Sequence, residues 1–182
     1  MIISPLSLAG VYLVEIEPQQ DERGYFARCF DSEQFKSQGL ASHFTQHSVS
    51  FNHKRGTLRG LHYQAEPHGE VKLVRCTRGE VFDVVVDLRQ DSPSRWCWVS
   101  VTLSEHNGQA LYIPAGFAHG FITLRDDTEL HYMIDVPYRP AAARTLRWDD
   151  PALAIGWPIP PALISPKDAT APLLPAPQSK GS

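Results

Sequence analysis

The stretch VKLVRCTRGEVFDVVVDL, residues 71–88, indicates the class of fold that this chain adopts. It is rich in β-branched residues, which favour extended strands. Arg78 and Gly79 interrupt it with the residue types of a tight turn. We therefore predict a β-hairpin with one strand over 71–77 and the other over 80–88.

Short strand-forming segments continue on both sides of this hairpin. They lie at 96–103, 109–113, 119–124 and 129–136 downstream, and at 11–16, 25–30 and 44–54 upstream. One short helix is expected between an N-cap at Asp31 and a stop at Gly39. The chain shows no alternation of strands with long helices and no glycine-rich phosphate loop. Short, regularly spaced strands predict an all-β antiparallel sandwich or barrel with a few short helices.

The C-terminal segment has a different composition. Seven of the fifteen prolines lie between residues 158 and 177. Proline lacks a backbone N–H, so this segment is not an interior strand or a long helix. It is either a loose tail or an arm that lies over the barrel.

Composition limits the classes of function. The 182 residues suffice for one domain, and a net charge of −3 without a run of Lys or Arg argues against binding to nucleic acid or anionic membranes. No apolar stretch approaches the roughly 20 residues that span a bilayer, and the N-terminus lacks the features of a secretory signal. Three cysteines without C-x-x-C spacing are most simply reduced thiols, which predicts a cytoplasmic protein.

The stretch GTLRGLHYQ, residues 56–64, holds the first candidate site. Strand alternation places Arg59 and His62 on opposite faces. A twist or bulge at Gly60 would bring both side chains into one cavity.

The question of a metal arises from Pro114-x-Gly116-x-x-His119, which resembles the second conserved motif of the cupin superfamily of small jelly-roll barrels. In metal-binding cupins the first motif supplies His-x-His and a following Glu. Here His62 is followed by Tyr63 and Gln64, and two histidines without a carboxylate make a poor metal site. We expect a barrel that needs neither a metal nor another cofactor.

The chain resembles the dTDP-4-dehydrorhamnose 3,5-epimerase family over nearly its whole length. The motifs that carry this resemblance are 21–26 (DERGYF), 56–64 (GTLRGLHYQ), 72–76 (KLVRC), 78–89 (RGEVFDVVVDLR), 114–121 (PAGFAHGF), 129–132 (ELHY), Tyr138, 147–151 (RWDDP) and Ser165-x-Lys167-Asp168. The resemblance implies a cupin-type double-stranded β-helix, or jelly-roll, and a homodimer. It also implies one domain over 1–182, with the proline-rich arm from about residue 152 packing over the barrel.

The implied activity is metal-independent inversion of C3, C5 or both in a nucleoside-diphosphate 4-keto-6-deoxyhexose, with dTDP as the expected nucleotide, in deoxysugar biosynthesis. The carbonyl makes the neighbouring protons acidic, so inversion needs a base, a group that stabilises the enolate oxygen and an acid on the opposite face. His62 is the expected base because an imidazole is suited to proton abstraction at neutral pH, and Asp168 would orient it. Lys72 would stabilise the enolate oxygen. Tyr132 matches the general acid of the family.

The resemblance also implies a set of substrate-binding residues. Two arginines would grip the diphosphate, because guanidinium groups pair well with phosphate oxygens. The remaining members would contact the sugar and the base. The set is Arg23, Phe26, Gln46, Arg59, His119 and Tyr138.

Three residues depart from the family pattern, all on the binding side of the pocket. Arg28 and Ala143 stand where glutamate is usual, and Ser48 stands where asparagine is usual. The alternatives that remain are a 3-only or 5-only epimerase and a sugar-nucleotide 3,4-ketoisomerase. A metal-dependent cupin oxygenase and a non-catalytic carbohydrate-binding jelly-roll are rivals from other classes.

Overall fold

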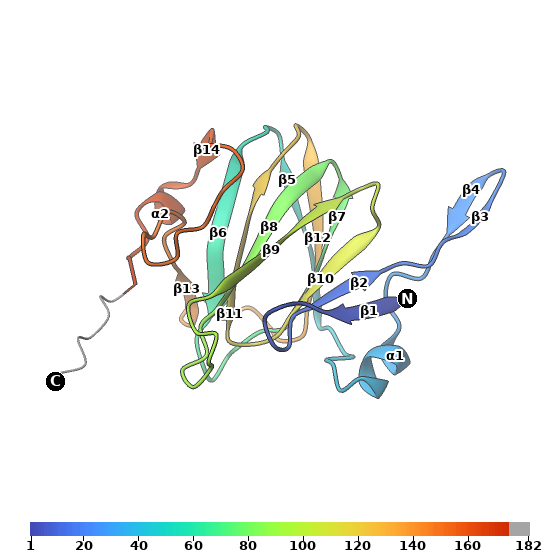
Figure 1. Ribbon diagram of the computed structural model, residues 1–182, viewed down its shortest axis with the longest axis horizontal. Helices are drawn as coiled ribbons and strands as arrows, with labels where there is room; N and C mark the ends of the chain where they lie inside the picture. Colours follow the sequence, from blue (N-terminus) through green and yellow to red (C-terminus); the bar gives the residue numbers. More distant parts are fainter. Residues whose placement is uncertain (175–182) are drawn as a thin grey trace.

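The computed structural model describes residues 1–174, which form two sheets packed face to face (Figure 1). In spatial order, the first sheet contains β1 (Ile2–Pro5), β2 (Tyr12–Glu15), β10 (Gln109–Ile113), β7 (Lys72–Arg78), β12 (Thr128–Ile134) and β5 (Gln46–Asn52). The second contains β13 (Ala143–Thr145), β6 (Thr57–Gln64), β11 (Phe117–Thr123), β8 (Glu80–Asp87) and β9 (Trp98–Ser104), and β14 (Leu163–Ile164) pairs in parallel with β6. A separate hairpin of β3 (Gln19–Asp21) and β4 (Gly24–Phe26) and two short helices, α1 (Ser32–Ser37) and α2 (Pro166–Ala169), complete the fold. The predicted all-β jelly-roll with a few short helices is confirmed.

The predicted hairpin over 71–88 is wrong, although both of its strands exist. β7 pairs with β10 and β12 in the first sheet, whereas β8 pairs with β11 and β9 in the second. Gly79 between them has a φ of +77°, and a Cβ at this position would collide with Thr128. The glycine turn therefore carries the chain from one sheet to the other. Turn residues mark where a strand ends, but they do not select its hydrogen-bonding partner.

Two other predicted strands are shorter than expected. β4 ends at Phe26, and the chain then turns toward α1, where Arg28 donates a hydrogen bond to Asp31. β9 begins at Trp98 because Trp96 has a φ of +69°, which is not a strand conformation. The helix prediction is confirmed, since the Asp31 carboxylate accepts hydrogen bonds from the backbone at both positions expected of an N-cap.

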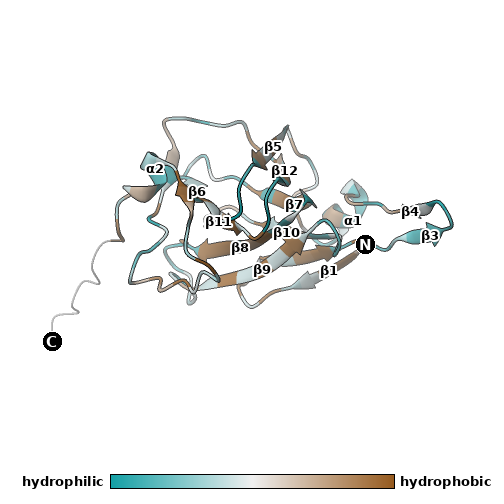
Figure 2. Ribbon diagram, turned by 90° about the horizontal axis from the view of Figure 1, so that it is seen from above, coloured by the Kyte–Doolittle hydropathy of each residue, from teal (hydrophilic) through white to brown (hydrophobic). Residues whose placement is uncertain are grey.

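Apolar side chains fill the space between the sheets and form one further cluster on the outer face of each sheet. The interior cluster includes Val74, Val85, Leu111 and Phe121, all almost fully buried. A second cluster lies on the outer face of the first sheet, where α1 covers it with Phe35. In Figure 2 the β3–β4 hairpin projects from the body, and β3 and the tip of the hairpin have the hydrophilic colour.

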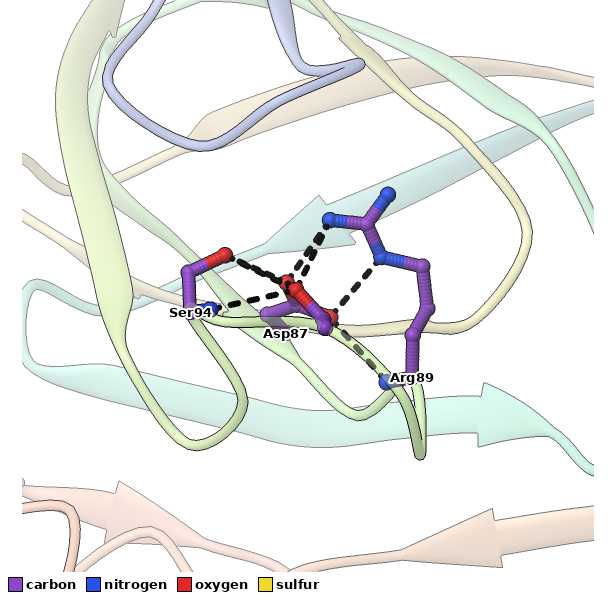
Figure 3. A network of polar contacts seen from close by, with 4 residues as sticks. Asp87, Arg89 and Ser94 are labelled. Carbon is purple, nitrogen blue, oxygen red and sulfur yellow. Dashed lines mark hydrogen bonds and ion pairs between the residues drawn. The ribbon is translucent and has the colours of Figure 1, made fainter.

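A buried carboxylate fastens the loop that follows β8. Asp87 accepts hydrogen bonds from Arg89, Ser92 and Ser94 at 2.6–2.9 Å (Figure 3). Burial alone would raise the pKa of Asp87, but these hydrogen bonds lower it well below its usual range. The guanidinium of Arg89 also lies 4.5 Å from the centre of the Phe117 ring. The network joins the loop to β11 without using any predicted site residue.

The proline-rich segment lies along β6. Leu163 and Ile164 of β14 pair with Thr57 and Leu58, and the short helix α2 follows directly (Figure 1). Leu174 donates its backbone N–H to the carboxylate of Asp150. Residues 175–182, which include the last two prolines, lie outside the described residues. None of the helices within 1–174 is long and apolar enough to cross a membrane.

Candidate active site

A cavity of about 460 Å³ lies between β6 and the C-terminal segment, and both Arg59 and His62 line it. The pairing of β6 with β11 shifts register opposite Gly60, which has a φ of +114°. A Cβ at Gly60 would lie 2.6 Å from the Cα of Gly120, so only glycine fits here. The irregularity at Gly60 that the sequence predicted is therefore confirmed, and it brings the two side chains to one cavity.

His62 is paired with the carboxylate of Asp168. The Nε2 atom of His62 lies 2.7 Å from Oδ1 of Asp168, while the backbone N–H of Gly60 approaches Oδ2 at 3.4 Å. The His62 side chain is 43% exposed, whereas that of Asp168 is 5% exposed. Burial would raise the pKa of Asp168, but the contact with His62, together with hydrogen bonds from the Gly60 backbone and Ser165, lowers it below its usual value. An ionised, buried carboxylate thus orients an accessible imidazole.

The N-terminus of α2 explains how Asp168 reaches this position. Ser165 caps the helix by accepting a hydrogen bond from the backbone N–H of Asp168. Pro166 occupies the first helical position, where its missing N–H costs nothing. The Ser-Pro-Lys-Asp sequence therefore builds the turn that points the carboxylate at β6.

Lys72 lies at the start of β7 with its side chain only 9% exposed. Its Nζ atom is 2.8 Å from Oε1 of Glu70 and 3.4 Å from the backbone oxygen of His62. The ammonium group is therefore next to the His62 backbone. The sequence analysis did not select Glu70, although a carboxylate two residues before Lys72 in an extended segment is a signal for such a pair.

The buried His119 and the partly buried Tyr132 form a second pair. His119 is opposite His62 in the β11–β6 pairing, and its Nε2 atom lies 2.9 Å from both carboxylate oxygens of Asp83. The ring of Tyr132 packs edge-on against His119 at a centroid distance of 5.9 Å. Burial, with the nearby charge of Asp83, raises the pKa of Tyr132 well above its usual range. The phenol therefore stays protonated and is suited to donate a proton. Asp83 was also missed, although a lone carboxylate inside an apolar strand is a recognisable signal.

A smaller cavity of about 240 Å³ adjoins the first. Tyr138 and Ala143 line it, and His62 and Lys167 line both cavities. The side-chain oxygen of Gln46 accepts a hydrogen bond from the backbone N–H of Tyr138 at 2.9 Å. Gln46 thus holds the segment that carries the aromatic ring at the mouth of this cavity.

Arg23 and Phe26 are not brought to these cavities within one chain. Both lie on the β3–β4 hairpin, which projects from the end of the molecule opposite α2 (Figure 1). Arg23 pairs with Asp21 of the same hairpin, and Phe26 is 70% exposed. Both side chains are thus available to another molecule.

The described residues contain no group of three or more His, Cys, Asp or Glu side chains placed to hold a metal ion. His62 and His119 each contact a carboxylate of their own. The site therefore consists of two separate histidine–carboxylate pairs, a lysine–glutamate pair and a partly buried phenol.

Comparisons with known proteins agree with this architecture. The model of the dTDP-4-dehydrorhamnose 3,5-epimerase family matches residues 5–176. A dTDP-4-dehydrorhamnose 3,5-epimerase of Sinorhizobium fredii is 45% identical over 175 residues, which cover 96% of this chain and 90% of the relative.

Two solved structures are also similar. The enzyme of the same name from Bacillus anthracis, crystallised with TDP and PPi, superimposes with a TM-score of 0.92 at 36% identity, over 95% of this chain and 99% of that one. A 3'-monoepimerase from Streptomyces bikiniensis in complex with dTDP-quinovose superimposes with a TM-score of 0.88 at 37% identity, over 93% and 86% of the two chains.

Proposed function

The chain belongs to the dTDP-4-dehydrorhamnose 3,5-epimerase family, and we propose that it inverts C3, C5 or both of a dTDP-linked 4-keto-6-deoxyhexose without a metal ion. The observation that carries this proposal is the 2.7 Å contact between His62 and the buried carboxylate of Asp168, at a cavity that also presents Arg59. This contact supports His62 as an oriented base, and Arg59 at the same cavity supports binding of a diphosphate.

In the proposed reaction His62 removes the proton from the carbon next to the C4 carbonyl. The electron pair of the broken C–H bond forms the C–C double bond of the enolate, and negative charge develops on the C4 oxygen. Asp168 stabilises the imidazolium that forms, since its carboxylate is buried and 2.7 Å away. The carboxylate itself stays ionised.

Lys72 and Tyr132 complete the inversion. The ammonium of Lys72 stabilises the oxygen of the enolate, as preorganised positive charge does in a site shielded from water. Tyr132 then donates its proton to the opposite face of the same carbon. The raised pKa keeps Tyr132 protonated before the reaction, and the tyrosinate left after donation takes up a proton from solvent. The proton taken up by His62 returns to solvent through the exposed side of the imidazole.

Substrate binding would use residues from both cavities. We assign Arg59 to the diphosphate, and its guanidinium is held by a 2.7 Å hydrogen bond to Asn52. Tyr138 would stack on the base, and Gln46 supports the backbone of that residue. His119, which is opposite His62 in the β11–β6 pairing, would contact the sugar with its ring fixed by Asp83.

We also propose that the chain 1–182 acts as one domain, with its proline-rich arm completing the site, and that two copies form a homodimer. The exposed positions of Arg23 and Phe26 support a dimer, because the hairpin that carries them projects away from the C-terminal arm of its own chain. The proposed location is the cytoplasm, which suits the three free cysteines of the described chain.

Proton NMR in deuterated water tests the reaction directly. The purified protein is mixed with dTDP-4-keto-6-deoxyglucose, and deuterium entry at C3 and C5 is followed. Exchange at both centres would support a 3,5-epimerase, and exchange at C3 alone would support a 3-epimerase like the Streptomyces bikiniensis relative. No exchange by the folded protein would overturn the proposal.

Two variants separate the base from the acid. His62→Ala is expected to abolish exchange, since no other base is oriented by a carboxylate in the same cavity of the described chain. Tyr132→Phe is expected to slow formation of inverted product more than loss of the substrate proton. Equal slowing of both steps would argue against Tyr132 as a selective acid.

A further inference from the structure

We propose that Glu70 is a positioning residue of this enzyme, which holds the ammonium group of Lys72 in the orientation that meets the enolate oxygen. The inference rests on the function proposed above and adds a residue to its machinery. No resemblance assigned a role to Glu70, and its contact with Lys72 emerges only in the folded chain.

The pair is buried at the site. Oε1 of Glu70 lies 2.8 Å from Nζ of Lys72, and the two side chains are 11% and 9% exposed. Glu70 also lines the smaller cavity, together with His62 and Tyr138. Burial of an ion pair requires the desolvation of two charges, so the pair adds little net stability to the fold. We therefore interpret the contact as one that fixes the position of the ammonium group.

The N–H donors of the Lys72 ammonium group show how Glu70 restrains it. An ammonium group has three N–H donors. One is used in the hydrogen bond to the backbone oxygen of His62 at 3.4 Å, and the ion pair with Glu70 at 2.8 Å restrains the group on another side. Within residues 1–174 no further acceptor contacts Nζ, so the third donor remains for the substrate. The two contacts set the direction in which this donor points.

The backbone next to Glu70 is itself held in place. The N–H of Val71 donates to the carboxylate of Asp135 at 2.8 Å, and the N–H of Asp135 donates back to the oxygen of Val71 at 3.2 Å. These bonds tie the segment before β7 to the end of β12, the strand that carries Tyr132. Glu70 therefore acts from a fixed position, and it links the lysine to the strand of the proposed acid.

Orientation of this kind affects turnover more than affinity. Without its carboxylate partner, Lys72 keeps its charge beside the His62 backbone but samples several rotamers, which must be restrained in each catalytic cycle. A misoriented Lys72 stabilises the negative charge that develops on the C4 oxygen less well. This charge is present in the transition state and not in the bound substrate, so kcat falls while KM changes little.

The kinetic test compares Glu70→Gln with Glu70→Asp. Glutamine keeps the shape but not the charge, and kcat is expected to fall about 10- to 100-fold with KM within about threefold of the wild-type value. Aspartate keeps the charge on a shorter side chain and is expected to recover part of that loss. Glu33→Gln, on an exposed face of α1, is the matched control and should leave kcat unchanged. A Glu70→Gln variant with kcat within twofold of wild type would overturn the proposal, as would a Glu70→Asp variant no faster than Glu70→Gln.

A second measurement does not depend on activity. In ¹H–¹⁵N NMR spectra of lysine ammonium groups, a fixed and shielded Lys72 should give a slowly exchanging signal, assigned by its absence in Lys72→Arg. Glu70→Gln is expected to broaden or remove this signal, and a signal that persists unchanged would overturn the role of Glu70 even in an active enzyme. Absence of deuterium exchange in the wild-type protein would instead overturn the proposed function. The two failures are therefore distinguishable.

Discussion

Replacement of Asp168 by asparagine tests the central contact of the proposed mechanism. Asparagine has nearly the same shape, and its side-chain oxygen can still accept a hydrogen bond from Nε2 of His62. The negative charge is lost at a position where the carboxylate is 5% exposed and 2.7 Å from the imidazole. The variant therefore removes the electrostatic support of the imidazolium and largely keeps the geometry.

The size of the effect follows from the charge and the burial of Asp168. A hydrogen bond to a charged group contributes about 1.5–3 kcal/mol, and little is lost to solvent screening at a buried carboxylate. Since about 1.4 kcal/mol corresponds to a factor of ten in rate, kcat should fall about 10- to 150-fold. KM should change little because the charge acts on the base.

The assay is deuterium exchange into the sugar, followed by NMR with saturating substrate. The matched control is Asp149→Asn, which removes an exposed carboxylate paired with Arg147. The control should keep wild-type kcat. If Asp168→Asn retained kcat within a factor of two while remaining folded, the assignment of His62 and Asp168 as an oriented base would be refuted.

Asp168→Asn is also expected to change how the free energy of unfolding depends on pH. The pKa of Asp168 is lowered in the folded protein, so its carboxylate stabilises the fold above the pKa of the unfolded chain. This contribution is lost as the pH falls through the lowered pKa. The difference in unfolding free energy between wild type and Asp168→Asn should therefore be constant near neutral pH and shrink below about pH 4. If the difference in unfolding free energy grew as the pH fell, the lowered pKa of Asp168 would be contradicted.

Three further predictions concern the fold. Gly60→Ala should lower the free energy of unfolding by about 3 kcal/mol or more, measured by denaturant titration, because its Cβ would meet the backbone of Gly120 at a positive φ; a loss below 1 kcal/mol would contradict this. Asp87→Asn should cost about 2–4 kcal/mol in the same measurement, since Arg89 loses a buried charged partner, and an unchanged melting temperature would argue against the network. Cys76, whose burial raises its pKa to about 12, should resist iodoacetamide at pH 8 while the two exposed cysteines react, as mass spectrometry would show; modification of Cys76 in the native protein would contradict its burial.

Local pattern predicted most of the strands and part of the site. The helix cap at Asp31 follows from the hydrogen bonding of one side chain with its own backbone, so sequence reasoning found it. The irregularity at Gly60 was also anticipated, because Arg59 and His62 share a cavity only if the strict alternation of a strand is broken there.

Several parts of the site depend on residues that are distant in the chain. Asp168 lies 106 positions from His62, and Asp83 lies 36 positions from His119. The sequence analysis placed Asp168 beside His62 only through a family resemblance, and it missed Asp83. Nothing in the local pattern states which carboxylate a histidine will meet.

By itself, the sequence determined the class of fold, since alternating apolar residues and turn residues act within a few positions of each other. It also determined where strands begin and end to within a few residues. Only the tertiary structure decided how those strands pair. The segments around Gly79 became strands of different sheets, because pairing is selected by burial and hydrogen bonding across the whole barrel. The contact of Glu70 with Lys72 has the same origin, because it becomes an ion pair only where the barrel excludes water from both side chains.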